Sequence, residues 1–238
     1  MTQSMNTPKE EIFSIAHKKS LEEKLATLRD MVVEDDIALE KKILKLFRLS
    51  LIGHGKDQNQ MRQIAQISKI LAQSLGLDAS YCDRLENAGW VYDIGNVMIS
   101  KEIYEKDEKL SFEEFKVVKS HTIVGEYVLK RQGFLVTNLA AVISSEHHEW
   151  WNGEGYPLQK KQNEIDIASR IVAIADTVGA LFRKRPGRNA WEYQKIVEYV
   201  ESRSGTQFDP EVVEVFLINQ ELIQEVLSTD LEDIPNKW

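Results

Sequence analysis

The sequence predicts an all-α fold, and three observations favour it. Apolar residues recur three and four positions apart along most of the chain, which places them on one face of a helix. Helix-capping residues precede several of these segments. No two alternating apolar runs are joined by a two-residue hairpin turn. The 238 residues, 42% of them hydrophobic, suffice for one sizeable core or for a core with a small appendage.

The first 50 residues predict two short helices separated by an acidic break. Their apolar stripes are Leu21, Leu25, Leu28 and Val32 in the first, and Leu39, Ile43 and Leu46 in the second. Both stripes are too short for a coiled coil. We interpret residues 1–50 as an N-terminal helical arm or hairpin and residues 51–238 as the main domain. A hairpin packed on that domain is slightly favoured over an arm that joins two copies into a homodimer.

The main domain begins with a polar hinge at 53–57 and continues with helices. The first helix carries the stripe Ile64, Ile67, Leu71 and Leu75. Gly76 can end this helix as its C-cap. Residues 83–91 predict a second, buried helix, and residues 101–109 form a charged, exposed stretch.

A capping box starts the next helix. Ser111 and Glu114 have the required spacing, and the apolar pattern carries this helix to about Leu129. Residues 139–146 suit a strand or a buried helix, and their length does not decide between the two. Three further segments follow: a loop at 151–157, a helix at 165–181, and a helix begun by Asp209 and Pro210.

The charge pattern excludes some partners. A net charge of −8 disfavours binding to duplex nucleic acid or to an anionic membrane surface, and no apolar run is long enough to span a membrane. The lone Cys82 favours a reducing compartment, so we expect a cytoplasmic protein. Residues 183–188 hold four cations, which is typical of a solvated charge run and also compatible with a local pocket for a small anion.

Five residues have the chemistry of metal ligands. Asp93 and Asp176 lie in apolar stretches, where an unpaired carboxylate is costly to bury. His147 and His148 are adjacent, a pair that one core histidine and one exposed histidine also explain. With His121 they make a mixed nitrogen and oxygen set, which suits iron, manganese or zinc better than calcium. Periodicity alone does not show that these residues meet.

The order of motifs resembles an HD-GYP domain, a branch of the HD metal-dependent phosphohydrolases. The matching segments are His147-His148-Glu149, Asn152-Gly153-Glu154-Gly155-Tyr156-Pro157, Ala168-Ser169-Arg170-Ile171, Ala175-Asp176, Arg185-Pro186-Gly187-Arg188 and Gly205-Thr206-Gln207-Phe208-Asp209-Pro210. The similarity covers roughly residues 50–220. It implies an HD-type helical bundle, a di-iron or related centre, and hydrolysis of the bacterial second messenger cyclic di-GMP or a related cyclic dinucleotide.

The chain departs from the family pattern at the residues that give the family its name. Tyr92 stands where the family has the histidine of the His-Asp pair, while Asp93 is kept. The upstream histidine position falls on Asn59, with His54 as a displaced alternative. Asn96 replaces a substrate-contacting lysine, and Asn152 replaces the aspartate before the loop glycine.

These departures affect one metal position more than the other. By resemblance, one metal is held by the positions of Asn59, Tyr92, Asp93 and Asp176, and the other by Asp93, His121, His147 and His148. Both imidazoles of the first set are missing. We therefore predict one divalent ion rather than two, iron or manganese with zinc as the next candidate, and an impaired catalytic role for Asp93.

The resemblance also assigns the ligand-binding residues. Arg185 and Arg188 match cations that contact the nucleotide phosphates, and Arg183 and Lys184 are expected to be solvated. Tyr156 and Pro157 shape the substrate side, and their loop, from Gly155 to Pro157, is linked in the family to protein partners.

Three functions follow, and we rank them in this order. The first is a degenerate signalling domain that binds a cyclic dinucleotide beside one metal, with weak or no hydrolysis. The second is an active phosphodiesterase with altered ligands, because a tyrosinate can replace imidazole. The third is a protein-interaction module without metal. Whether the chain is an enzyme stays open at the level of its sequence.

Overall fold

The computed structural model describes residues 36–104, 106, 108–184 and 189–229, and the chain divides into two units, 1–43 and 44–238. In the first unit the described residues, 36–43, are helical. The predicted stripe from Leu21 to Val32 lies outside the described residues. The division at residue 50 and the role of the N-terminal segment therefore stay predictions.

The second unit is built from helices. Residues 44–53 are helical and are followed by α2 (Gln58–Ser74), α3 (Ala79–Gly89), a 3₁₀ helix η1 (Ile94–Met98), α4 (Lys101–Tyr104), α5 (Phe112–Lys119), α6 (His121–Lys130), α7 (Leu135–Glu146), a 3₁₀ helix η2 (Gln162–Glu164), α8 (Ile167–Phe182), α9 (Tyr193–Ser202), α10 (Pro210–Ile218) and α11 (Gln220–Ser228). No strand occurs among the described residues. The prediction of an all-α fold is confirmed.

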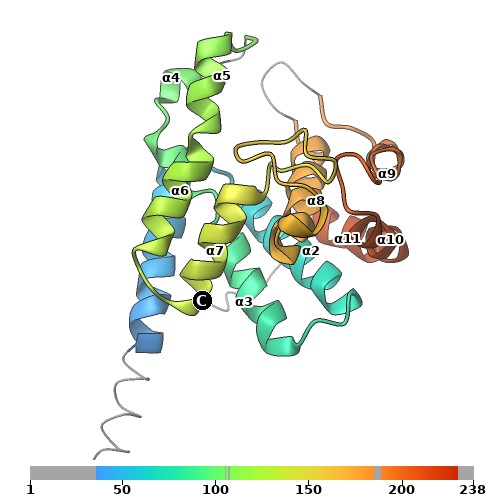
Figure 1. Ribbon diagram of the computed structural model, residues 1–238, viewed down its shortest axis with the longest axis horizontal. Coiled ribbons are helices and arrows are strands. Elements are labelled where there is room, and N and C mark those ends of the chain that lie inside the picture. Colours follow the sequence, from blue (N-terminus) through green and yellow to red (C-terminus); the bar gives the residue numbers. More distant parts are fainter. Residues whose placement is uncertain (1–35, 105, 107, 185–188, 230–238) are drawn as a thin grey trace, which may run out of the picture. The chain divides into compact units, whose positions relative to one another are not determined.

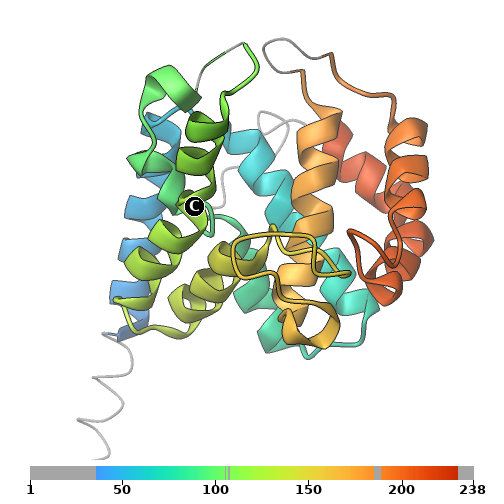
Figure 2. The ribbon, with the colours of Figure 1, turned by 45° about the horizontal axis from the view of Figure 1, so that its top comes forward.

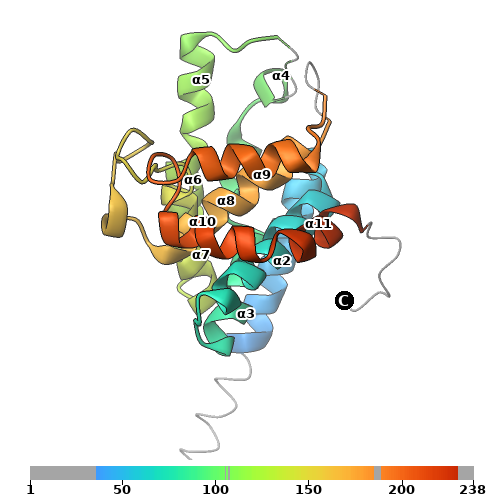
Figure 3. The same cartoon turned by 90° about the vertical axis from the view of Figure 1, so that its right-hand side faces the viewer.

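Helices α2 and α8 form the centre of this unit and pack on each other (Figure 1). Asp57 caps the start of α2 by accepting a hydrogen bond from the Gln60 amide at 2.9 Å. Gly76, with φ +75°, follows its last turn, in the left-handed conformation that glycine favours. On the side turned to the viewer in Figure 3, α9, α10 and α11 cover α8 and α2.

One predicted helix is two helices. The expected helix from Ser111 to Leu129 starts at the predicted capping box but is interrupted at Ser120, which separates α5 from α6. The Ser120 hydroxyl and amide both bond to the Val117 carbonyl, three residues back, which tightens the turn locally. Helix α5 buries none of its residues, whereas α6 begins with the buried His121.

The predicted stripe Leu39, Ile43 and Leu46 is wrong at two positions. Leu39 and Leu46, expected to face inward, are 48% and 62% exposed, and the buried residues of this helix are Leu44 and Leu51. These two residues are seven positions apart, so they lie on the same face of the helix, and both pack into the core of the second unit. Residues 139–146, undecided from the sequence, lie within helix α7, which is buried between α6, α3 and α8 (Figure 2).

Two glycines allow the close packing that positions the site. A Cβ atom on Gly95 would lie 1.9 Å from the His121 carbonyl oxygen, and one on Gly125 would lie 2.1 Å from the Ser144 hydroxyl. Thus η1 packs directly on the backbone of α6, and α6 packs closely on the Ser144 side chain of α7. Among the described residues, no helix has the length and apolar character needed to cross a bilayer.

Candidate metal centre

The predicted ligands come from four elements, and all but Asp176 lie at or beside the ends of helices. Asp93 directly precedes η1, and His121 is the first residue of α6. His147 and His148 follow the last turn of α7, where neighbouring side chains are free to face one point. Asp176 lies on α8.

The three histidines form a compact cluster, which we call the imidazole cluster. One ring nitrogen from each of His121, His147 and His148 lies within 4.8 Å of the other two, and the group contains neither Asp93 nor Asp176. Backbone carbonyls orient two of these rings. His121 Nδ1 lies 2.6 Å from the Val118 oxygen, and His147 Nδ1 lies 2.9 Å from the Ile143 oxygen.

This orientation leaves lone pairs facing each other. If each Nδ1 carries the proton and donates it to its carbonyl, the Nε2 atoms of His121 and His147, 3.3 Å apart, are both acceptors. Burial, with His121 as a neighbour, lowers the pKa of His147, and burial also lowers that of His148, so both rings favour the neutral form that binds metals. A cation between these nitrogens resolves the conflict.

Asp93 offers an oxygen to the same position. Its Oδ1 is buried, lies 3.5 Å from His121 Nε2, and accepts no hydrogen bond from the part of the chain that the structure describes. A buried carboxylate oxygen without a partner is costly. The donor set of one carboxylate oxygen and three imidazoles therefore fits a divalent transition metal ion.

A lysine that sequence reasoning missed holds the other oxygen of Asp93. Lys56 Nζ forms a hydrogen-bonded ion pair with Asp93 Oδ2, and both side chains are 10% exposed. Burial raises the pKa of the Asp93 carboxyl, but Lys56 and the nearby His121 and His147 outweigh it, so the pKa lies far below its usual range. The only signal in the sequence was that Asp93 and Asp176 lie in apolar stretches, where a buried carboxylate needs a compensating partner.

Two residues that depart from the family pattern, one in place of a histidine and one in place of a lysine, make other interactions. Tyr92, 2% exposed, donates its hydroxyl to Asp176 Oδ1 at 2.9 Å and packs edge-on against the His147 ring. Asn96, also buried, donates to the backbone carbonyl of Asp93 at 3.1 Å.

Neither candidate for the upstream ligand lies in the imidazole cluster. The Asn59 amide oxygen accepts hydrogen bonds from Arg62 Nε and Nη2, at 3.0 and 2.8 Å. His54 packs against Tyr104 at a ring separation of 5.0 Å.

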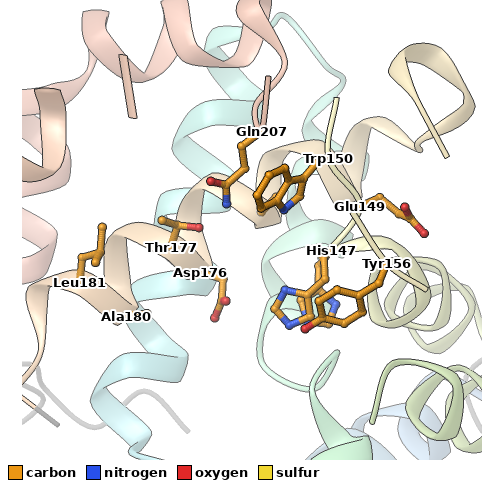
Figure 4. Close-up of a pocket in the computed structure, with 11 residues that line it drawn as sticks. His147, Glu149, Trp150, Tyr156, Asp176, Thr177, Ala180, Leu181 and Gln207 are labelled. Carbon is orange, nitrogen blue, oxygen red and sulfur yellow. The ribbon is translucent and has the colours of Figure 1, made fainter. Parts of the chain in front are cut away.

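A cavity of about 300 Å³ opens beside the cluster. It is lined by the histidine pair and by Tyr156, Asp176, Trp150 and Gln207 among others, and Figure 4 shows Asp176 on one side with His147 and Tyr156 on the other. The Tyr156 ring stacks on the His148 ring with 4.7 Å between the ring centroids. Lys119 Nζ lies over the Tyr156 ring, 5.6 Å from its centroid. Burial raises the pKa of the Tyr156 hydroxyl, which therefore stays protonated.

The loop that carries Tyr156 is held at both ends. Trp151 and Asn152 donate backbone hydrogen bonds to the carbonyls of Gln207 and Thr206, at 3.1 and 2.9 Å. A Cβ on Gly155 would lie 2.3 Å from the Trp150 amide nitrogen, so this position requires glycine. Of the predicted loop residues, Tyr156 contacts the cluster through His148 and lines the cavity, and Pro157 follows it in the chain.

The basic segment is described only in part. Arg183, expected to be solvated, instead forms an ion pair with Asp57, because the end of α8 meets the hinge before α2. That expectation was wrong. Arg185 and Arg188 lie outside the described residues, so their contact with phosphate stays a prediction.

The geometry is that of a helical protein with three convergent histidines at the ends of its helices, and comparison with known proteins shows its family. A family model described as HD domain matches residues 32–212. The chain belongs to this family, and its predicted place as an HD-GYP domain of the HD superfamily is confirmed.

Curated relatives match most of this chain but are longer. A cyclic di-GMP phosphodiesterase of Thermotoga maritima is 31% identical over 222 residues, which cover 92% of this chain and 60% of the relative. A 3'3'-cGAMP-specific phosphodiesterase of Vibrio cholerae is 34% identical over 157 residues, 66% of this chain and 30% of the relative. The chain therefore spans about a third to three fifths of the length of these two proteins.

Solved structures share the fold. An HDG"Y"P protein from Bdellovibrio bacteriovorus matches with a TM-score of 0.56 at 17% identity, over 69% of this chain and 51% of that one. The phosphodiesterase PgpH HD domain of L. monocytogenes, in complex with cyclic-di-AMP, matches with a TM-score of 0.53 at 14% identity, over 78% of this chain and 98% of that one. The predicted HD-type helical bundle is confirmed.

Proposed function

We propose that this chain is a signalling domain that binds a cyclic dinucleotide, such as cyclic di-GMP, beside one metal ion and hydrolyses it slowly or not at all. One observation carries the proposal: His147 and His148 of the imidazole cluster line a cavity of about 300 Å³, and the unpartnered Oδ1 of Asp93 lies 3.5 Å from Nε2 of His121, the third member of the cluster. The class of ligand is that of the relatives, which are named for cyclic di-GMP and 3'3'-cGAMP.

The proposed ion is held by Asp93, His121, His147 and His148. Mixed imidazole and carboxylate donors suit iron or manganese, with zinc next. When bound, such an ion supplies a Lewis acid for a phosphodiester oxygen. Asp176 stays a predicted ligand. It lines the cavity, and its Oδ1 accepts a hydrogen bond from the Tyr92 hydroxyl.

Weak hydrolysis is supported by the state of the second metal position. An in-line displacement at phosphorus is fastest when two ions clamp the attacking and the leaving oxygens. At this position the Tyr92 hydroxyl donates a hydrogen bond to Asp176 instead of offering a lone pair to a metal. The Asn59 side-chain oxygen accepts a hydrogen bond from Arg62. These contacts leave few donors for a second ion.

The surrounding residues suit a nucleotide. Tyr156 and Trp150 offer aromatic faces to the cavity, and Gln207 and Thr177 offer hydrogen-bonding groups. Arg185 and Arg188 remain the proposed phosphate contacts. A protein partner at the loop from Gly155 to Pro157 and a homodimer through the N-terminal helices stay predictions.

The test combines metal content, binding and turnover. We expect about one ion per chain by elemental analysis, heat of binding with cyclic di-GMP, 3'3'-cGAMP or cyclic di-AMP in calorimetry, and turnover about 100-fold or more below an intact HD-GYP phosphodiesterase assayed beside it with Mn²⁺ and Fe²⁺. His147→Ala is expected to lose the ion. His54→Ala, which removes an imidazole outside the cluster, is the matched control and is expected to keep it.

Each alternative has its own result. Turnover equal to that of the intact enzyme would favour an active phosphodiesterase with altered ligands. A chain that binds neither metal nor any of the three nucleotides would favour a metal-free interaction module.

A further inference from the structure

We propose that the ammonium group of Lys56 is a built-in cation that takes the place of a second metal ion in this site. The inference deepens the proposed function and rests on it, because it concerns the position next to the one proposed ion. Nothing in the resemblance assigns a role to this residue, which the sequence places in a polar hinge.

The two oxygens of Asp93 serve different positive partners. Oδ2 is ion-paired with Lys56 Nζ, whereas Oδ1 faces His121 Nε2 at 3.5 Å without accepting a hydrogen bond from the described residues. A carboxylate shared by two metal ions divides its oxygens in the same way. The ammonium group therefore stands at the oxygen that does not face the imidazole cluster.

The charge balance supports this placement. Asp93 is 7% exposed, and Asp176 lies half-buried in the same region, so the centre holds two carboxylates. Lys56 Nζ is ion-paired with Asp93 Oδ2, and both side chains are 10% exposed, so the positive charge lies within the centre itself. Buried carboxylates without a cation are strongly unfavourable, and Lys56 compensates them with no ion bound.

The chain holds Lys56 in this position from both sides. The Lys56 amide donates to the Leu51 carbonyl at 3.0 Å, which closes the turn after the preceding helix. The next residue, Asp57, caps α2 with Oδ1 and pairs through Oδ2 with Arg183 at the end of α8. With its neighbours fixed in this way, the Lys56 side chain is directed toward Asp93.

The chemical consequence is a site that binds without reacting quickly. An ammonium group supplies positive charge and three hydrogen-bond donors, but it has no vacant coordination position and does not make a bound water acidic. Lys56 therefore preserves the electrostatics of a two-cation centre while removing half of its hydrolytic chemistry.

The experiment restores an imidazole with and without the lysine. Tyr92→His supplies a ligand at the second position, and with Lys56 in place we expect its metal content to stay at that of the wild type. Lys56→Ala combined with Tyr92→His is expected to gain about one further Mn²⁺ per chain by elemental analysis. Lys69→Ala with Tyr92→His is the matched control, because Lys69 pairs with Asp83 and Glu86 on the α2–α3 surface, and it is expected to gain none.

A second measurement covers variants that fold poorly. In chelator, Lys56→Ala is expected to melt several degrees below the wild type, and Mn²⁺ is expected to raise its melting temperature more than that of the wild type. Lys56→Arg keeps a cation and is expected to resemble the wild type in both respects.

The inference is overturned if Tyr92→His alone gains the further ion, or if the double variant with Lys56→Ala gains none. It is also overturned if Lys56→Ala matches the wild type in chelator and in its response to Mn²⁺. A wild type without metal would refute the proposed function, while a gain specific to loss of Lys56 would still support this inference.

Discussion

The centre has two sides that differ in what balances their charge. The imidazole side, made of Asp93 Oδ1 and the three clustered histidines, has lone pairs that converge without a partner. The lysine side, made of Lys56, Tyr92 and Asp176, is closed by an ion pair to Asp93 Oδ2 and by a hydrogen bond from Tyr92 to Asp176. On the lysine side the cation is the ammonium group of Lys56, and on the imidazole side it is the metal ion of the proposed function.

Under the function proposed above, this difference shows how a two-ion site would lose an ion without losing its fold. Removing an imidazole alone would leave carboxylates buried and uncompensated, which costs several kcal/mol. A lysine from a neighbouring hinge and a tyrosine hydroxyl supply the charge and the hydrogen bond instead. The two sides therefore make separate predictions about stability, metal content and pH.

The largest effect is expected where the sides are joined. In Gly95→Ala, the new Cβ would lie 1.9 Å from the His121 carbonyl and 2.8 Å from the Gly125 amide nitrogen, both backbone atoms. Either η1 or α6 must shift, which separates Asp93 from His121. We expect the free energy of unfolding in urea to fall by about 3 kcal/mol or more, and the bound metal to be lost.

Gly53→Ala is the control for this substitution. Gly53 is helical, and a Cβ there would meet no atom within 4 Å. It is expected to stabilise the protein by about 0.5 kcal/mol. If Gly95→Ala keeps both its stability and its metal, the close approach of η1 to α6 does not hold the two sides together.

A smaller effect is expected on the lysine side alone. Tyr92→Phe removes the hydroxyl that donates to Asp176 at 2.9 Å. We expect the free energy of unfolding to fall by about 1.5 kcal/mol, because the acceptor is a carboxylate, with the metal content unchanged. Tyr127→Phe, at a residue 61% exposed, is the control and is expected to change stability by less than about 0.5 kcal/mol. Loss of the ion in Tyr92→Phe would mean that Tyr92 serves the imidazole side.

The smallest effect is a difference in pH dependence, measured in chelator. Burial lowers the pKa of His147 and His148 in the folded protein, whereas in the unfolded chain these groups titrate near 6.5. Below that pH the unfolded chain binds more protons, so stability is expected to fall from pH 7 to pH 5, by about 1 kcal/mol in urea denaturation.

The ion pair of the lysine side is not expected to contribute to the pH dependence of stability between pH 7 and pH 5. The Asp93 pKa is lowered in the fold, so its stabilisation is present above its ordinary value of 3.8 and is lost only as the pH falls below it. Accordingly, His148→Gln should make the profile between pH 7 and pH 5 less steep, with His147 causing the remaining slope, whereas Asp93→Asn should not flatten it, because loss of the Asp93 charge lowers the pKa of His147 further. A flat profile in the wild type would contradict the lowered pKa values of His147 and His148.

Much of the fold followed from local patterns. Ser111, Asp209 and Gly76 cap helices as their residue types predict, because capping depends on bonds within a few residues. The break at Ser120 was not predictable, because the apolar spacing continues across it. The exposure of Leu46 was not predictable either, because the spacing of apolar residues does not tell which of them a neighbouring element covers.

By itself, the sequence determined the helical class, the family and the list of residues with ligand chemistry, because periodicity, caps and motif order are all properties of neighbouring positions. Only the tertiary structure decided which of these residues meet: His121 joins the pair at 147 and 148, and Asp93 divides its oxygens between that cluster and Lys56. The pairing of a hinge lysine with an aspartate 37 positions away depends on how the helices pack, and no local pattern encodes it.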